Sequence, residues 1–171
     1  MADPTSEQRT GILEYLRQQA AKRSIEEIIS RVQDGVDAVA IAARLVPEDR
    51  LSELGPGEGE PWTPVDCLKH VVDWNRLCAQ QILYVALSGE LPEGAIRPEL
   101  PETIDGLIEF QQQAIDSLFA HVRDADPDAY LYVTWEHPFF GNLNWREWLM
   151  FLRVHCLDHA PQLKAHAGIP G

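Results

Sequence analysis

The chain has 171 residues, enough for one hydrophobic core, so we expect a single domain over residues 1–171. Its 14 basic and 27 acidic side chains leave a formal net charge of −13, which repels nucleic-acid phosphates and anionic lipid head groups. No stretch approaches the roughly 18 uninterrupted apolar residues of a membrane-spanning helix. We therefore expect no nucleic-acid partner and no membrane partner.

The cysteines and the first residues favour a cytoplasmic location. Cys67, Cys78 and Cys156 are odd in number and lack a CxxC spacing, as expected of reduced thiols. Residues 1–19 lack the basic start and the apolar run of a secretory signal. A cytoplasmic protein is the expectation that follows.

Apolar residues recur with a helical period from the N-terminal region onward. A first helical piece is expected over residues 7–21, either as a separate helix or as one arm of a long bent one. Ser24 and Glu27 then form a capping-box pattern that opens a second helix, which runs to about Leu45. Its apolar stripe consists of Ile25, Ile28, Ile29, Val32, Val36, Val39 and Ala43.

A loop rich in glycine and proline is expected over residues 54–61, and another over residues 89–102. Between them, Thr63 is a suitable N-cap, and Pro64 suits the first helical position because no N–H is needed there. The helix that follows ends near Gly89. Its buried stripe consists of Cys67, His70, Val71, Trp74, Cys78, Ile82 and Val85.

A further helix begins at Thr103 and stops before Asp126. Residues 126–143 form a long connection, which is typical of a functional or covering segment. Within it, the sequence YLYVTW at 130–135 could form a short strand or an extended arm.

Asn144 with Glu147 repeats the capping-box pattern and opens the last helix. The stripe of this helix consists of Trp148, Leu149, Leu152, His155, Cys156, His159 and Leu163. Four long amphipathic helices predict an all-α four-helix bundle, with residues 1–23 as an extra N-terminal helical segment.

His155 and His159 are candidate metal ligands. Four residues turn a helix by about 400°, so the two imidazoles lie one turn apart on the same face and can share an ion. The HExxH motif uses the same spacing, but its glutamate is missing here. A metal site needs a third protein ligand. His70 is the best candidate, because it lies on the buried stripe of the helix that follows Pro64.

The axial levels of the three histidines agree if their two helices are antiparallel. At about 1.5 Å per residue, His70 lies about 10 Å from the start of its helix. His159 and His155 lie about 12 and 18 Å from the end of theirs, near Ala167. In a parallel arrangement, His155 and His159 would lie about 16 and 22 Å from the start of their helix, a worse match to His70.

Other interpretations of the histidines remain open. A hydrogen-bonded polar cluster without an ion would need several internal partners, and few are obvious. In a purely structural bundle the histidines would never meet. Asp73 and Asp158 each follow a histidine by three residues and could orient the imidazoles, although we favour a solvated acidic face for Asp158. His137 could line a pocket mouth or lie on a loop surface.

Two stretches carry a family resemblance: WTPVDCLKH at 62–70 and HPFFGNLNWREWLMFLRVHCLDHAPQL at 137–163. They resemble the DinB-like superfamily of bacterial four-helix bundles, and the resemblance covers about residues 24–163. Relatives carry a tryptophan and a Ser or Thr before the helix of the first histidine, and an HxxxH pair on the last long helix. The resemblance implies an up-down-down-up bundle with a divalent metal held by His70, His155 and His159.

Some members of this superfamily are thiol transferases or isomerases that use bacillithiol, mycothiol or glutathione, and many have no known activity. The leading hypothesis is therefore a metal-dependent enzyme, a low-molecular-weight thiol S-transferase with a small-molecule substrate and a thiol cosubstrate. The resemblance also implies a homodimer. Imidazole suits zinc, nickel, copper and iron, and we expect a divalent Zn, Ni or Fe ion.

The alternatives for function follow from the same three histidines. They leave a coordination position at which a thiol would lose its proton and become a nucleophile. Water at that position would instead give a metal-dependent hydrolase. The absence of a clear general base beside the histidines also allows a non-catalytic metal- or small-molecule-binding protein.

Overall fold

The computed structural model describes residues 5–55, 62–94 and 97–169. Its elements are α1 (Ser6–Lys22), α2 (Ile25–Arg44), the 3-10 helix η1 (Glu48–Arg50), α3 (Pro64–Ser88), α4 (Ile104–Val122), β1 (Thr134–His137), β2 (Gly141–Asn144) and α5 (Trp145–His166). The predicted helical fold is confirmed, with one small hairpin added. Of the loop expected at 54–61, residues 56–61 lie outside the described ranges. None of the helices in these ranges is both long enough and apolar enough to cross a membrane.

Helix starts follow the capping patterns in the sequence. The side chain of each N-cap accepts a hydrogen bond from a backbone N–H of the first turn. These N-caps are Thr5, Ser24, Thr63, Thr103 and Asn144. Because Arg23 and Ser24 are both extended, α1 is a separate helix rather than one arm of a bent one.

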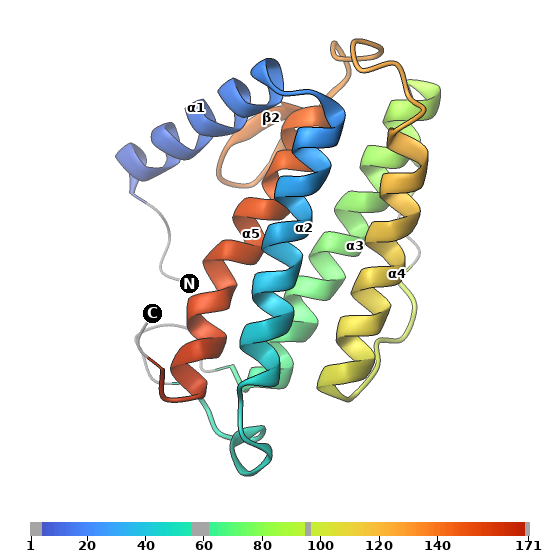
Figure 1. Cartoon of the computed structure of the whole chain (residues 1–171). Helices are drawn as coiled ribbons and strands as arrows, with labels where there is room; N and C mark the ends of the chain where they lie inside the picture. The colour runs from blue at the N-terminus through green and yellow to red at the C-terminus, as the bar shows by residue number, and fades with distance from the viewer. Residues whose placement is uncertain (1–4, 56–61, 95–96, 170–171) are drawn as a thin grey trace.

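The bundle consists of α2, α3, α4 and α5, and α1 lies obliquely outside it (Figure 1). α3 packs against α4 and α5, α2 packs along α5, and α2 barely touches α3. In Figure 1 the chain runs down α2, up α3, up α4 and down α5. The up-down-down-up order is therefore present, and α3 and α5 are antiparallel, as the histidine levels predicted.

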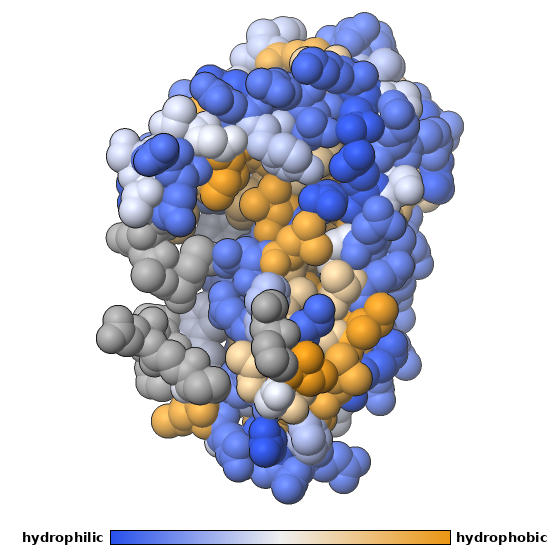
Figure 2. Space-filling view, turned by 60° about the vertical axis from the view of Figure 1, so that its left-hand side comes forward, coloured by the Kyte–Doolittle hydropathy of each residue, from blue (hydrophilic) through white to orange (hydrophobic). Residues whose placement is uncertain are grey.

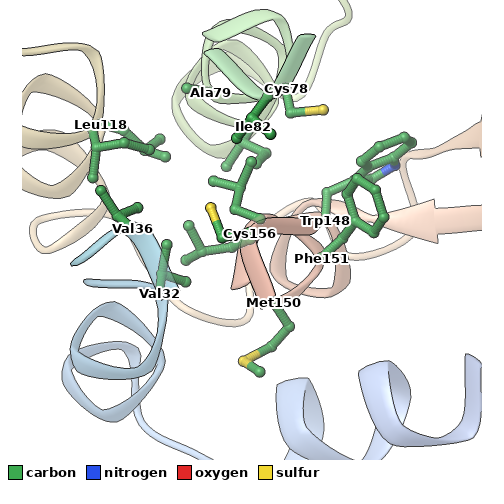
Figure 3. Packing of buried hydrophobic residues seen from close by; sticks show 14 of the residues in the cluster. Val32, Val36, Cys78, Ala79, Ile82, Leu118, Trp148, Met150, Phe151 and Cys156 are labelled. Carbon is green, nitrogen blue, oxygen red and sulfur yellow. The ribbon is translucent and has the colours of Figure 1, made fainter. Parts of the chain in front are cut away.

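The core lies where the four bundle helices meet (Figure 3). Val36 of α2, Ile82 of α3, Leu118 of α4 and Cys156 of α5 are all buried there. Gly35 allows α2 to approach α5 closely, because a Cβ atom at this position would lie 3.2 Å from the Cα atom of Arg153.

A hairpin and α1 complete the side of the molecule formed by α5. β1 and β2 pair antiparallel, with His137 opposite Gly141. Of the stretch 130–135, only the last two residues belong to β1, because Tyr130 has a φ of 57° and closes a turn with Val133. Trp135 stacks on Trp148 of α5, with ring centroids 5.3 Å apart. This stacking fixes the hairpin beside the start of α5.

Candidate metal centre

The three predicted histidines converge between α3 and α5. One ring nitrogen from each of His70, His155 and His159 lies within 4.8 Å of the others. The Nε2 atoms of His70 and His155 are 3.3 Å apart. Two nitrogen ligands on a tetrahedral ion, with bonds of about 2.0–2.1 Å, have about this separation. In the described part of the chain, no other group of three potential ligands is as closely gathered.

Asn75 holds His155 in the tautomer that a metal requires. The His155 Nδ1 lies 2.9 Å from the Asn75 Oδ1, while the amide nitrogen of Asn75 donates to the Cys156 Sγ. The carboxamide oxygen only accepts hydrogen bonds, so the imidazole proton is on Nδ1. The Nε2 lone pair therefore points toward His70.

His159 has a buried polar atom that needs a partner. Its side chain is 1% exposed, and its Nε2 has no hydrogen-bond partner among the residues that the structure describes. Its Nδ1 lies 3.8 Å from the Cys67 Sγ, and the Trp62 ring stacks above the imidazole at 6.1 Å. An unpaired buried polar atom costs free energy. A cation bound at Nε2 would remove this cost, so the residues fit a metal ion.

Burial keeps the imidazoles of His155 and His159 neutral. It lowers the pKa of His159 to about 4. For His155, burial and the neighbouring imidazoles of His159 and His70 hold the pKa well below its ordinary value. Neutral imidazole is the form that binds metal, so protons do not compete for these ligands near pH 7.

Asp73 and Asp158 could have oriented the imidazoles, but among the described residues no hydrogen bond joins either carboxylate to an imidazole of the cluster. Asp73 instead pairs with Arg97 at 3.4 Å, because its carboxylate lies on the outer part of α3. Asp158 is exposed, as favoured from the sequence. Sequence reasoning missed Asn75, although a signal was present: it lies four residues after Val71, within the buried face of α3.

The cysteines beside the histidines are neutral thiols. Burial raises the pKa of Cys67 to about 12 and that of Cys156 to about 12. Without a metal ion, a thiol with such a pKa is not an activated nucleophile near pH 7. In the described part of the chain, the gathered group of potential ligands therefore consists of the three imidazoles and contains no cysteine.

A cavity of about 670 Å³ opens beside His70 and His155, between α1, the hairpin, α3 and α5. Figure 2 shows this side of the molecule, where apolar side chains gather around a hollow. The tryptophan and phenylalanine side chains that line the cavity are Trp74, Phe139, Phe140 and Phe151. A small molecule in this cavity would lie directly beside the histidine cluster.

His137 also lines this cavity, so the pocket alternative for this residue is correct. It is 4% exposed and packs against Phe140 and Phe151, with ring centroids 4.5 and 4.4 Å away. Its Nδ1 accepts a hydrogen bond from the Phe139 N–H at 3.1 Å. Burial lowers its pKa to about 4, so the ring is neutral near pH 7.

The fold and the site define a helical bundle with a buried three-histidine cluster beside an aromatic cavity. The chain belongs to the DinB superfamily, whose family model matches residues 14–163. This match confirms the resemblance seen in the two histidine-bearing stretches.

Comparison with solved structures agrees with this fold. Crystal structures of the mycothiol-dependent maleylpyruvate isomerase and of a histidine-to-alanine mutant of it each superimpose with a TM-score of 0.63 at 18% identity. Each match covers 84% of this chain and 62% of the isomerase chain. At this identity the similarity shows a shared fold. No curated protein matches the sequence.

Proposed function

We propose that this protein is a divalent-metal-dependent enzyme that transfers a low-molecular-weight thiol to a small-molecule substrate, with His70, His155 and His159 as the metal ligands. The observation that carries the proposal is the convergence of one nitrogen from each histidine within 4.8 Å. The unpartnered, buried Nε2 of His159 supports an ion at this point.

The chemistry of the site follows from its residues. An ion held by three imidazoles lowers the pKa of a thiol or a water molecule that takes a remaining position. Asn75 keeps the His155 lone pair directed at the site, and the aromatic cavity excludes water around a bound substrate. In the transfer, the S–H proton leaves to solvent. A C–S bond then forms as the substrate loses a leaving group or takes up a proton.

The thiol has to come from a cosubstrate. Cys67 and Cys156 are buried neutral thiols, and burial also raises the pKa of Cys78. The fold similarity to a mycothiol-dependent isomerase supports a thiol rather than water as the reacting group. Hydrolysis by the same ion is the alternative, and a non-catalytic binding protein is the other possible outcome of the experiments below.

Elemental analysis of protein purified without a His-tag tests the metal site. We expect about one Zn, Ni or Fe ion per chain in the wild type, and a loss of more than about tenfold in His70→Ala, His155→Ala and His159→Ala. His121→Ala is the matched control, because His121 lies exposed on α4 and its Nδ1 hydrogen-bonds to the Ser117 carbonyl oxygen of the same helix. Metal-free wild-type protein, or equal loss in the control, would contradict the assignment.

Thiol consumption tests the reaction. Bacillithiol, mycothiol and glutathione are each incubated with electrophilic substrates, with and without chelator. Chelator-sensitive conjugation supports a transferase. Thiol-independent hydrolysis supports the hydrolase, and metal binding without turnover supports the binding protein.

Two expectations about the whole protein remain proposals. A homodimer would show in light scattering as twice the 19.3 kDa chain mass. A cytoplasmic location agrees with the free state of the three cysteines.

A further inference from the structure

The cavity beside the histidines has an apolar wall and no cationic lining. Aromatic rings form most of it, and among the described residues that line it no lysine or arginine occurs. The charged side chain on the lining is the carboxylate of Asp158. The Arg9 guanidinium lies over the Phe139 ring, 5.3 Å from its centroid, and is not part of the lining.

Apart from an ion at the histidine cluster, the described part of this lining offers no cation to an anionic group. A carboxylate that enters an apolar cavity loses its hydration, and this loss is compensated only by a cation or by several hydrogen bonds. Asp158 adds repulsion instead. Aromatic walls gain free energy from burying uncharged apolar surface, so the aromatic part of the cavity favours an uncharged, aromatic-sized group.

His137 supplies a fixed hydrogen-bond donor in this wall. Its Nδ1 is engaged by the Phe139 N–H, so the proton of the neutral imidazole is on Nε2. The rings of Phe140, Trp148 and Phe151 pack around it at centroid distances of 4.5, 5.1 and 4.4 Å and fix its orientation. The polar atom that His137 can offer to a ligand is therefore a donor.

We infer that the substrate of the proposed transferase carries an uncharged, aromatic-sized group with a carbonyl oxygen, and that the Nε2–H of His137 donates a hydrogen bond to this oxygen. Such a hydrogen bond draws electron density away from the carbon that a thiolate attacks. The inference rests on the proposed function for the reaction, whereas the cavity and the donor can be tested by binding alone.

The test uses three fluorinated probes and fluorine NMR titration of the metal-analysed wild-type protein. Para-fluoroacetophenone carries the carbonyl, para-fluoroethylbenzene lacks it, and para-fluorobenzoylformate adds a carboxylate. We expect the ketone to bind the wild type about fivefold more tightly than the hydrocarbon, which is the increment of one hydrogen bond. In His159→Ala, where the ion is lost, the anion should bind most weakly of the three.

Two variants assign the increment to His137. In His137→Phe the aromatic packing is kept and the donor is lost, so the ketone should bind no better than the hydrocarbon. In His137→Gln the side-chain amide can donate from a similar position, so part of the ketone preference should return. Thermal unfolding of both variants verifies that they are folded at the titration temperature.

The outcomes separate this inference from the proposed function. An unchanged ketone preference in His137→Phe, an anion that binds His159→Ala more tightly than the ketone does, or no binding by any probe would overturn the inference. The same titrations on His159→Ala measure binding to the cavity when one of the three proposed metal ligands is removed. The ketone should still bind this variant more tightly than the hydrocarbon does. If the protein prefers the ketone but contains no metal, the proposed function would be contradicted, whereas the hydrogen bond from His137 to the carbonyl oxygen would still be supported.

Discussion

Among the individual residues, Asn75 decides how well the histidine cluster can hold an ion. It is 1% exposed, and its carboxamide oxygen contacts the His155 Nδ1. Partners of this kind fix ring orientation, and their loss typically lowers metal affinity about 10–100-fold. We expect Asn75→Ala to weaken metal binding by this factor, measured by competition with a chelator of known affinity.

Gln111→Ala is the control for Asn75→Ala. Gln111 is also a buried amide and also lies near the Cys156 sulfur, at 3.9 Å. No hydrogen bond between Gln111 and an imidazole is found among the described residues, so this variant should keep the wild-type affinity. Equal weakening in both variants would mean that buried amides matter through general packing and not through His155.

His137 gives a prediction about pH. Burial lowers its pKa from an ordinary value of 6.5 to about 4. Between these values the unfolded chain binds a proton that the folded protein does not. With respect to His137, the free energy of unfolding is therefore highest above pH 6.5, and it decreases as the pH falls from 6.5 to 4. The slope is about 1.4 kcal/mol per pH unit for one such group.

Urea unfolding of chelator-treated protein at pH 7, 6 and 5 measures this effect. From pH 6.5 to 5 the wild type should lose about 2 kcal/mol more free energy of unfolding than His137→Phe. If both proteins lost the same free energy of unfolding from pH 6.5 to 5, His137 would be protonated in the folded state over this range.

For the elements, the close approach of α2 and α5 depends on Gly35. A Cβ atom there would lie 3.2 Å from both the Cα and the carbonyl oxygen of Arg153, and backbone atoms cannot easily move away. Gly11 is also helical, but a Cβ atom there meets nothing within 4 Å. Gly11→Ala should therefore gain about 0.5–1 kcal/mol from helix propensity alone.

Gly35→Ala has the same propensity gain but adds overpacking. We expect it to be less stable than Gly11→Ala by about 1–3 kcal/mol in urea unfolding. Similar gains in the two variants would show that α2 and α5 can separate without cost.

The features that could be predicted from the sequence are those that depend on local geometry within one helix. The four-residue spacing of His155 and His159, and the level of His70, follow from the geometry of single helices. The caps at Ser24 and Asn144 are equally local, and they were correct. Periodicity therefore sufficed for the bundle and for the histidine cluster.

The cavity and the hairpin depend on contacts that no period encodes. The packing of α1 against α5 joins segments far apart in the chain, and it forms one wall of the cavity. The stretch 130–135 has strand-like composition, but the left-handed turn at Tyr130 shifts the strand to Thr134–His137. His137 was therefore placed in the pocket only by the folded structure.

In the whole molecule, an ion at the histidine cluster would join α3 to α5. His70 and His155 are separated by 85 positions, so the complete site exists only in the folded chain. A ligand that binds only the folded state stabilises it by about 2.7 kcal/mol at a concentration of 100 times its Kd. For a chain of this size that corresponds to a rise in Tm of roughly 5–10 °C.

Removing the ion should therefore lower the Tm of the wild type by this amount, measured by calorimetry with and without chelator. His159→Ala should melt at the same temperature in both conditions, because the ion is already absent, while His121→Ala should respond like the wild type. A chelator effect of the same size in His159→Ala would place the ion elsewhere in the protein. An unaltered wild-type Tm would show that the three imidazoles stabilise the bundle by their own contacts, and the transferase proposal would then lose its physical basis.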